Sequence, residues 1–483
     1  MSFLQPEFAG FFAVVCAVYW VLPAARWQNV WLLLASWLFY GWVSPVLLVL
    51  LLSVTLANYG AARLIDRFPA RGGQILGALT AASVANLAVF KYFGWFTAEI
   101  APKFFSPERT AAIDALHVVM PLGLSFYTFH NLSYSIDVRR KAVAVRTDVL
   151  DVLLFGSYFP QLVAGPIERA EHIFPQIDKK RSFEATRFLS GLALALWGAF
   201  QKVVIADTLA PYVDLIFGAD HASWAMIWAG TLGFALQVLA DFAGYTAIAR
   251  GTSRMLGIEL VENFNHPYLA ATPTEFWQRW HISLSSWLRD YVYFPLCFSR
   301  SVQRWLTIPG TGKWRPSANS ARALLITMLL SGLWHGSTPK FLLWGLYHFV
   351  LITTYITVER RLPKHLRDAG GWRWLTVPLM FCWTLVSMLI WREPTAARIA
   401  EHLKLNPFAE NADQLIVATS MLGLCAYAAA PLLFALAWER WLGPRVTHRG
   451  LQPVAWSVGC TAMALAILAS AQAQPSAFVY FQF

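Results

Sequence analysis

The chain has 483 residues, of which 57% are hydrophobic and only 13% are charged. Soluble globular proteins usually carry about 25% charged residues, so the composition excludes an ordinary soluble protein and indicates a membrane protein. The net charge of +11 comes from basic residues between apolar runs, where anionic lipid and the positive-inside rule explain it. We therefore expect membrane lipid, and no nucleic acid, among the partners.

Long apolar runs recur along the whole chain and predict an all-α polytopic membrane protein with about 11 to 13 transmembrane helices, some of them half-length. The first run follows a start without a basic leader, so we expect a first transmembrane helix and not a cleaved signal peptide. We expect one membrane-embedded domain. The domain covers residues 1–483, and its runs are 8–22, 30–57, 75–96, 118–134, 149–164, 188–205, 224–249, a hairpin over 322–358, 375–391, 415–438 and 454–471.

The charges between the runs orient these helices. Residues 206–221 contain three aspartates and no Lys or Arg, so we expect this connection outside the cell. Four other connections are rich in Arg and Lys, and the positive-inside rule places them in the cytoplasm. They are residues 60–72, 137–148, 359–373 and 439–449.

Residues 250–322 form the longest segment between predicted spans, and we expect them to be a cytoplasm-facing region that is amphipathic or re-entrant. Thr272 fits a helix N-cap, a proline follows it at the first helical position, and Glu275 completes a capping box. We expect one amphipathic helix over 272–291 along the membrane interface. His281 would lie on its polar face, and a plain surface helix explains the tryptophans here better than it explains this histidine.

A second histidine, His335, stands between the two apolar runs of the hairpin over 322–358. From Arg322 to His335 the chain advances 13 residues, which is roughly 20 Å of helix, whereas a full crossing needs about 20 residues. We therefore expect His335 part-way through the bilayer. An ionisable side chain at that depth indicates a functional site, and the alternative is a hydrogen bond to a neighbouring helix that serves packing alone.

Seven short segments stand in order along nearly the whole chain. They are PLGLSFYTF at 121–129, FPQLVAGPI at 159–167, DFAGY at 241–245, NFNHPY at 263–268, FWQRWH at 276–281 with RDY at 289–291, WHG at 334–336 and FVYFQF at 478–483. Each segment alone is weakly specific, but together and in this order they resemble the membrane-bound O-acyltransferase family, in its bacterial alginate O-acetylase-like branch.

The resemblance implies helices in a ring around a thinned centre, with a funnel from each side and additional interfacial helices. It implies that His335 is the membrane-embedded catalytic histidine and that His281 is the second histidine, in a cytoplasm-facing motif. The acyl donor would enter from the cytoplasm and the acyl group would leave outward. In some relatives the motif at 478–483 is proposed to carry the acyl group on its tyrosine, here Tyr480, whereas from the residues alone Tyr480 could be an interfacial aromatic anchor.

The chain departs from the branch at two places. Relatives commonly have Gly-Gly where Cys297 and Phe298 stand here, which concerns the loop near the donor. They commonly have Ser-Asp where Thr246 and Ala247 stand, so a buried carboxylate is missing here. Neither difference involves the two histidines.

O-acylation needs a base for the attacking hydroxyl, and neutral imidazole, with an unperturbed pKa of about 6.5, suits that proton transfer. No Ser or Cys adjoins His335, so the sequence does not indicate a local Ser-His acyl-enzyme. The cysteines lack zinc-ligand spacing, and we expect no metal. Six residues are expected at the donor channel, although core packing and the positive-inside rule also explain residues of these types: Trp277, Arg279, Trp280, Arg289, Asp290 and Trp334.

These observations predict a multi-pass O-acetyltransferase of the bacterial inner (cytoplasmic) membrane. It would move an acetyl group from cytoplasmic acetyl-CoA across the membrane for O-acetylation of an extracytoplasmic polysaccharide. Acetyl-CoA is then the acyl-CoA substrate, no bound cofactor is expected, and a periplasmic acyltransferase partner protein would act beside the glycan acceptor. Two alternatives stay open: D-alanyl transfer to teichoic acid from a carrier-protein thioester, and a transporter or flippase whose buried polar groups line a substrate path.

Overall fold

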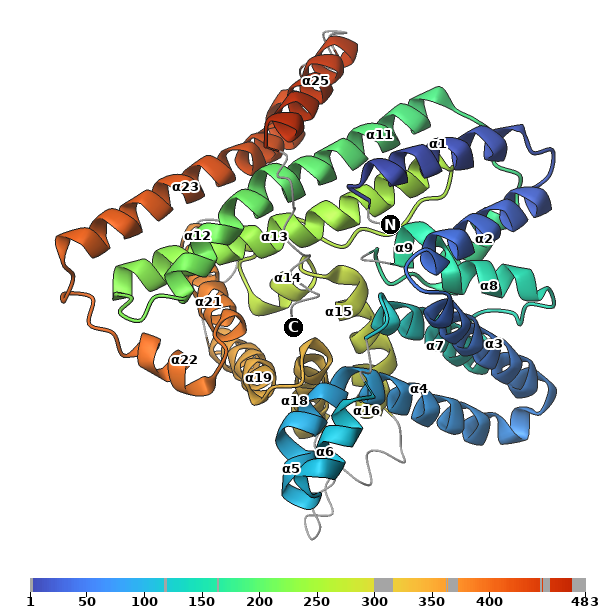
Figure 1. Ribbon diagram of the computed structural model, residues 1–483, viewed down its shortest axis with the longest axis horizontal. Helices are drawn as coiled ribbons and strands as arrows, with labels where there is room; N and C mark the ends of the chain where they lie inside the picture. The colour runs from blue at the N-terminus through green and yellow to red at the C-terminus, as the bar shows by residue number, and fades with distance from the viewer. Residues whose placement is uncertain are drawn as a thin grey trace. The chain divides into compact units, whose positions relative to one another are not determined.

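The computed structural model describes residues 3–116, 120–162, 165–298, 316–361, 363, 372–443, 445 and 452–470. Within these residues the chain is helical and contains no strand, which confirms the all-α polytopic class (Figure 1). Eight described helical stretches are long and apolar enough to cross a membrane. They are Pro45–Arg67, Pro69–Phe104, Ala185–Phe217, Trp224–Met255, Pro339–Glu359, Arg373–Arg392, Ala412–Leu442 and Pro453–Ser470. The predicted ring with two funnels stays a prediction.

The chain divides into two compact units. The first comprises Met1–Ala195 and Thr246–Val261, and the second comprises Leu196–Tyr245 and Glu262–Phe483. Both units share the long helices α11 and α13. The helices of the first unit are α1 (Pro6–Val21), α2 (Ala25–Gly41), α3 (Pro45–Arg67), α4 (Gly72–Trp95), α5 (Ala101–Phe104), α6 (Pro107–Asp114), α7 (Leu124–Arg140), α8 (Val149–Ser157), α9 (Phe159–Leu162), α10 (Ala170–Ile177) and the start of α11 (Ala185–Phe200).

Two of the seven sequence segments meet in the first unit. Gly123, in the segment 121–129, has a left-handed backbone with a φ of 71° and directly precedes α7. A Cβ atom at this position would clash with the carbonyl oxygen of Leu162, which ends α9 in the segment 159–167. The glycine therefore serves both the turn and the close approach of the two segments.

The second unit contains the region with both predicted histidines. Its helices are α12 (Asp207–Phe217), α13 (Trp224–Met255), α14 (Pro273–Trp277), α15 (Ile282–Leu288), α16 (Phe294–Phe298), α18 (Pro316–His335), α19 (Pro339–Glu359), α21 (Arg373–Arg392), α22 (Ala396–Leu403), α23 (Ala412–Ala437) and α25 (Gln452–Ser470). Short turns of other helix types connect some of them, among them the π-helical turns η3 (Gln201–Ala206), η5 (Arg289–Tyr293) and η7 (Trp438–Leu442).

The hairpin around His335 consists of α18 and α19, which pack against each other, with α21 beside α19 (Figure 1). Two glycines allow the close crossing of α18 and α19. A Cβ atom on Gly332 would clash with the carbonyl oxygen of Phe341, and one on Gly345 would clash with that of Met328. Small residues at the crossing let the two backbones approach, as is common between membrane helices.

The predicted depth of His335 took Arg322 as the membrane boundary. Helix α18 begins earlier, at Pro316, and has 20 residues, which corresponds to about 30 Å. The helix is long enough to cross the hydrocarbon core, and the part-way position of His335 stays a prediction.

Three predictions about spans and connections are wrong. Residues 30–57 do not form one span, because α2 ends at Gly41 and α3 begins at Pro45. Residues 149–164 do not form one span, because the chain turns at Tyr158 between α8 and α9, each far too short to cross the membrane. The predicted outer connection 206–221 is largely helical, because α12 continues α11 through η3. The apolar pattern of 149–164 and the acidic pattern of 206–221 therefore did not predict where the helices begin and end.

A buried ion cluster explains why residues 206–221 do not form an exposed loop. The Nζ atom of Lys202 lies 2.7 Å from Oδ1 of Asp207 and 2.8 Å from Oδ1 of Asp241, and the three side chains are at most 2% exposed. Charged groups are buried only where opposite charges and hydrogen bonds compensate the lost water. Asp207 therefore belongs to the interior of the second unit and not to its surface.

Two ion pairs join segments to which the charge pattern assigns the same side of the membrane. Arg392, at the predicted outer end of α21, lies 2.8 Å from Asp214 of α12. Arg373, at the predicted cytoplasmic start of α21, lies 2.9 Å from Glu275 of α14. The two pairs are consistent with one orientation of α21.

We predict that Gly332→Ala destabilises the protein by about 1–3 kcal/mol, because overpacking forces α18 away from α19. The measurement is the thermal unfolding temperature of the detergent-solubilised protein. Gly423→Ala on α23 is the matched control, since a Cβ atom there meets nothing within 4 Å. The control should match or exceed wild-type stability because alanine favours helices. Equal stability of Gly332→Ala and the control would contradict the tight crossing.

Candidate active site

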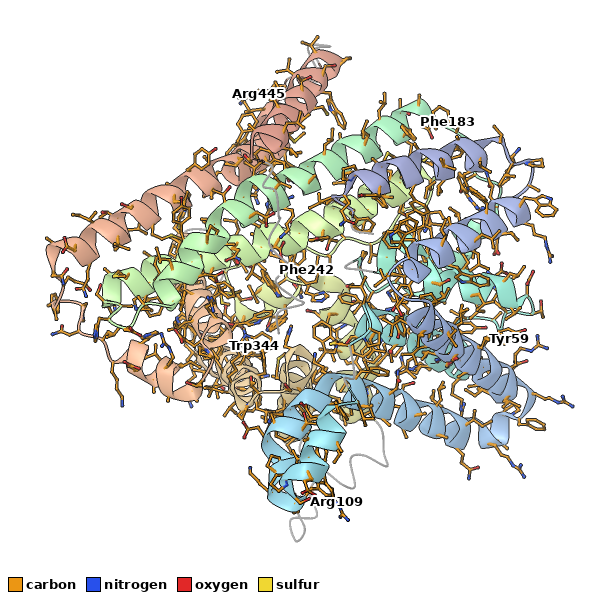
Figure 2. The ribbon with its side chains drawn as sticks, in the orientation of Figure 1. Tyr59, Arg109, Phe183, Phe242, Trp344 and Arg445 are labelled. Atoms are coloured by element: carbon orange, nitrogen blue, oxygen red, sulfur yellow. The ribbon has the colours of Figure 1, made fainter. Side chains whose placement is uncertain are left out.

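His335 is the last residue of α18, and aromatic side chains enclose its ring. Its ring centroid lies 4.7 Å from those of both Trp344 and Trp391 and 4.8 Å from that of Trp334. Trp344 stands on α19 (Figure 2), and Trp391 stands near the end of α21. The side chain of His335 is only 5% exposed. Three helices thus form an indole box around one imidazole.

Hydrogen bonds between α19 and α21 hold two walls of this box. The indole N–H of Trp344 donates to the Ser387 hydroxyl at 2.8 Å. The Lys340 ammonium donates to the backbone carbonyl of Trp391, also at 2.8 Å. Both Lys340 and Ser387 are buried. The two ties fix α19 and α21 next to each other at the level of His335.

His281 lies where the chain reverses between α14 and α15. Its backbone is left-handed, with a φ of 42°, and its side chain is 1% exposed. The prediction of one continuous amphipathic helix over 272–291 is therefore wrong, and so is the placement of His281 on a polar surface. The reversal turns the imidazole into the interior of the second unit.

A distant asparagine, Asn263, supports this reversal. Its carbonyl oxygen Oδ1 accepts hydrogen bonds from the backbone N–H of Ser283 at 3.1 Å and from the Ser283 hydroxyl at 2.9 Å. Its backbone carbonyl accepts from the N–H of Ile282 at 2.9 Å. The turn residues Ile282 and Ser283 are thereby tied to Asn263, a long-range contact that a local helix pattern does not contain.

Asn263 also determines which ring nitrogen of His281 carries the hydrogen. The Oδ1 atom of Asn263 lies 3.1 Å from Nδ1 of His281. Because an amide oxygen only accepts, Nδ1 carries the ring hydrogen and Nε2 carries the lone pair. Burial lowers the pKa of His281 to about 3. His281 is therefore neutral near pH 7, with Nε2 in the form that can accept a proton or a hydrogen bond.

At the start of α14 the predicted N-cap at Thr272 is confirmed, but the predicted capping box with Glu275 is wrong. The Thr272 hydroxyl caps the helix by accepting from the N–H of Glu275 at 3.0 Å. The Glu275 carboxylate reaches the N–H of Ala271 instead of that of Thr272, and it also binds Arg279 and Arg373. Partial burial tends to raise the pKa of Glu275, but the hydrogen bonds from these three groups outweigh it and hold the pKa below its usual value.

Trp334 brings the two predicted histidines into one cluster. Its ring centroid lies 4.8 Å from that of His335 and 5.7 Å from that of His281. His281 also contacts Phe242, with ring centroids 4.7 Å apart. Phe242 stands on α13 (Figure 2). One indole ring thus separates the two imidazoles, and both belong to the second unit.

The other predicted channel residues divide into two groups. Trp277 reaches the box, with its ring 5.8 Å from that of Trp344. The remaining residues have other contacts. Trp280 packs between Phe264 and Phe276, Arg279 pairs with Glu275 at 2.7 Å, and Arg289 pairs with Asp290 at 2.8 Å. Tyr480 lies outside the described residues.

Sequence reasoning missed a third histidine at the indole box, the buried His348. It stands on α19, is 2% exposed, and its ring lies 4.5 Å from that of Trp344 and 4.9 Å from that of Trp277. The available signal was its spacing, because Lys340, Trp344 and His348 recur every four residues and share one face of α19.

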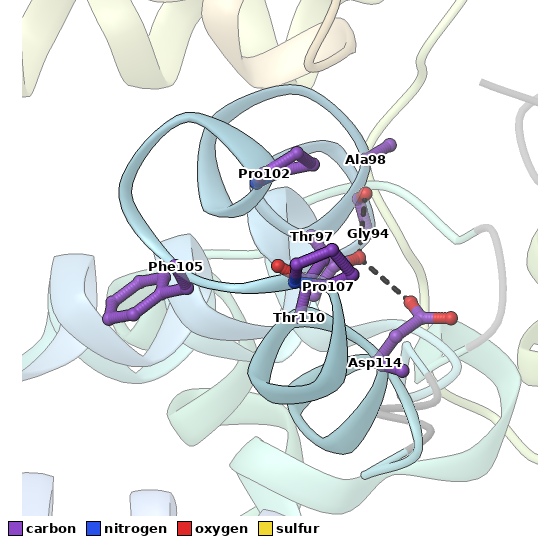
Figure 3. Close-up of a pocket in the computed structure, with 9 residues that line it drawn as sticks. Gly94, Thr97, Ala98, Pro102, Phe105, Pro107, Thr110 and Asp114 are labelled. Atoms are coloured by element: carbon purple, nitrogen blue, oxygen red, sulfur yellow. Dashed lines mark hydrogen bonds between the residues drawn. The ribbon is translucent and has the colours of Figure 1, made fainter.

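The first unit contains a cavity of about 530 Å³ (Figure 3). It is lined by α4, α5, α6 and the turn between them. Within it the Thr97 hydroxyl donates to the Asp114 carboxylate at 2.9 Å. No residue predicted for catalysis or for the donor channel lines this cavity.

Comparison with known proteins decides the family. The chain matches the membrane-bound O-acyltransferase (MBOAT) family over residues 91–390, a range that contains both His281 and His335. It is 34% identical over 389 residues to a protein of Azotobacter vinelandii named as a probable alginate O-acetylase, covering 79% of this chain and 73% of that protein. The chain belongs to the membrane-bound O-acyltransferase family.

Two further relatives of this O-acyltransferase differ in the group or acceptor that their names state. A peptidoglycan O-acetyltransferase of Helicobacter pylori is 32% identical over 387 residues, covering 73% of this chain and 68% of the relative. A teichoic acid D-alanyltransferase of Bacillus subtilis is 31% identical over 261 residues, covering 53% and 64%. The resemblance inferred from the seven segments is thereby confirmed.

For this O-acyltransferase we predict that Asn263→Asp shifts the pH dependence of activity. The new carboxylate keeps the acceptor for Ser283 and His281, so the fold should be retained. Its negative charge favours the imidazolium and raises the pKa of His281 above its value of about 3. Protonation removes the Nε2 lone pair, so the acid limb of the kcat/KM profile should move to higher pH.

The exposed Asn406 offers a control, because Asn406→Asp adds the same charge away from the histidines. Its pH profile should match that of the wild type. If Asn263→Asp folds and its profile also matches the wild type, the neutral form of His281 has no role in turnover.

Proposed function

We propose that this protein is an O-acetyltransferase of the bacterial inner membrane. It takes an acetyl group from acetyl-CoA on the cytoplasmic side and passes it across the membrane for O-acetylation of an extracytoplasmic polysaccharide. Acetyl-CoA is a substrate, and the chemistry needs no bound cofactor. A periplasmic acyltransferase partner would complete the transfer to the glycan.

The observation that carries this proposal is the enclosure of His335 in the indole box, one ring away from the neutral His281. A neutral imidazole shielded from water is suited to base catalysis, which is typically worth about 10² to 10⁴ in rate. The relatives support acetyl as the transferred group, since the O-acetylase relative covers 79% of this chain and the D-alanyltransferase relative covers 53%.

In the proposed reaction a hydroxyl oxygen attacks the thioester carbonyl carbon, the new C–O ester bond forms and the C–S bond breaks. His335 accepts the hydroxyl proton and returns it to the leaving thiolate, so no proton is consumed overall. His281 supports the reaction with its Nε2 lone pair. The box excludes water, which would otherwise hydrolyse the thioester, and holds the reactants in position.

The donor would approach from the cytoplasmic segment that contains α14 and η5. Trp277 and Trp334 would line the thioester end of the passage because both contact the box or its histidines. Arg279 and Arg289 already face carboxylates. They would therefore bind the phosphate groups of the donor while each stays paired with its carboxylate. Tyr480 remains our proposal for an acyl carrier, from its motif at 478–483.

The test is acetyl transfer by the purified protein in lipid vesicles with labelled acetyl-CoA. We expect His335→Gln to reduce label transfer and donor hydrolysis by about 10² to 10⁴. His402→Gln serves as control, because His402 is also buried in the second unit but pairs with Glu393 at 2.7 Å. It should retain most of the activity.

Three outcomes would contradict the proposal in different ways. Transfer from an acyl carrier-protein thioester and not from acetyl-CoA would favour D-alanyl transfer. Flux of an intact substrate that survives in His335→Gln, without acyl transfer, would favour a transporter or flippase. Full activity of His335→Gln would remove the catalytic role of His335.

Label recovered on Tyr480 in the isolated protein would support the role of Tyr480 as acyl carrier. Absence of label on Tyr480 during turnover would exclude that role.

A further inference from the structure

A row of hydrogen-bonded residues, here called the polar ladder, joins α19 to α21 and includes two walls of the indole box, Trp344 and Trp391. On α19 its members Lys340, Trp344 and His348 are spaced by four residues, and on α21 Ser387 and Trp391 have the same spacing. This spacing places each set on one helix face. All five residues are buried. The two faces meet each other, since each member on α19 hydrogen-bonds a residue of α21.

Ser387 is the centre of the ladder because it binds two side chains at once. Its Oγ atom lies 2.8 Å from Nε1 of Trp344 and 2.8 Å from Nε2 of His348. An indole nitrogen can only donate, so the Ser387 oxygen accepts from Trp344. The single hydroxyl hydrogen of Ser387 can then point to Nε2 of His348. In either direction the bond to His348 orients the serine, and the serine in turn orients the indole.

The oriented indole is a wall of the catalytic box. The rings of Trp344 and His335 lie 4.7 Å apart at an angle of 79°, an edge-to-face contact. Such contacts depend on ring orientation as well as distance. Rotation of the Trp344 ring would therefore change both the position of His335 and the access of water to it.

We propose that Ser387 and His348 are positioning residues for acyl transfer, which act on His335 through Trp344. Neither residue touches the His335 ring in the contacts described, and their effect is to fix the indole that does. The expected changes in kcat rest on the proposed function. A role in helix packing alone would alter stability without a selective effect on the chemical step.

The experiment compares Ser387→Ala with Thr384→Val. Thr384 is a matched control because it is a buried hydroxyl on the same helix, 2% exposed, whose Oγ1 bonds only its own helix, at the Met380 carbonyl. We expect Ser387→Ala to lower kcat by about 10- to 100-fold with an unchanged KM for the donor, because small misplacements at a reacting centre have effects of this order. Thr384→Val should keep the wild-type kcat.

Two further variants separate positioning from packing. Ser387→Thr keeps the hydroxyl and should restore most of the kcat lost in Ser387→Ala. His348→Leu removes this hydrogen bond to Ser387, and combined with Ser387→Ala it should lower kcat no further than either change alone, since both act through one hydrogen-bonded unit. Additive losses, or no rescue by Ser387→Thr, would contradict the proposal.

A readout without turnover distinguishes failure of this inference from failure of the proposed function. Diethyl pyrocarbonate modifies accessible imidazoles, and peptide mass spectrometry reports its rate at His335. We expect slow modification in the wild type and in Thr384→Val, and a rate at least several-fold higher in Ser387→Ala. Equal rates in all three proteins would overturn the positioning role, whichever donor the enzyme uses.

Discussion

The contact of the His335 imidazole with the rings of Trp344 and Trp391 is the constraint on which the rest of the site depends. It requires the ends of three helices, α18, α19 and α21, to meet at one level. The glycine crossing brings α18 against α19, and the ties from Lys340 and Ser387 fix α19 against α21. The geometry of the candidate site is therefore a property of helix packing.

Three buried polar side chains of the second unit, Lys202, Asn263 and Ser387, each hold separate segments of the chain together. Lys202 joins two aspartates of different helices, Asn263 supports the reversal at His281, and Ser387 connects α21 to α19. In an apolar interior an unsatisfied polar group is costly, so such groups fix one arrangement of the helices strongly. Aromatic rings surround both His281 and His335, and burial keeps His281 neutral, which suits proton transfer to and from a hydroxyl.

The sequence predicted the features that depend on local pattern. The helical hairpin with His335 at its turn follows from hydropathy, and the cap at Thr272 follows from spacing. The break at His281 was not predictable locally, because it depends on Asn263, which lies 18 positions earlier. Asp207 was assigned to an exposed loop because its partner Lys202 lies within an apolar run. His348 was overlooked because its partner Ser387 belongs to another helix. Long-range pairing was the missing information for His281 and His348, whereas for Asp207, whose partner Lys202 stands five residues earlier, it was the burial of the pair.

Chemical rescue tests the central claim, that His335 acts as a base and not as packing, most directly. His335→Ala leaves a space within the indole box, and added imidazoles of increasing basicity can enter it. We predict that the variant is inactive alone and that transfer returns with a rate that rises with the basicity of the added imidazole. Transfer by His335→Ala at the wild-type rate, without any added imidazole, would contradict the account.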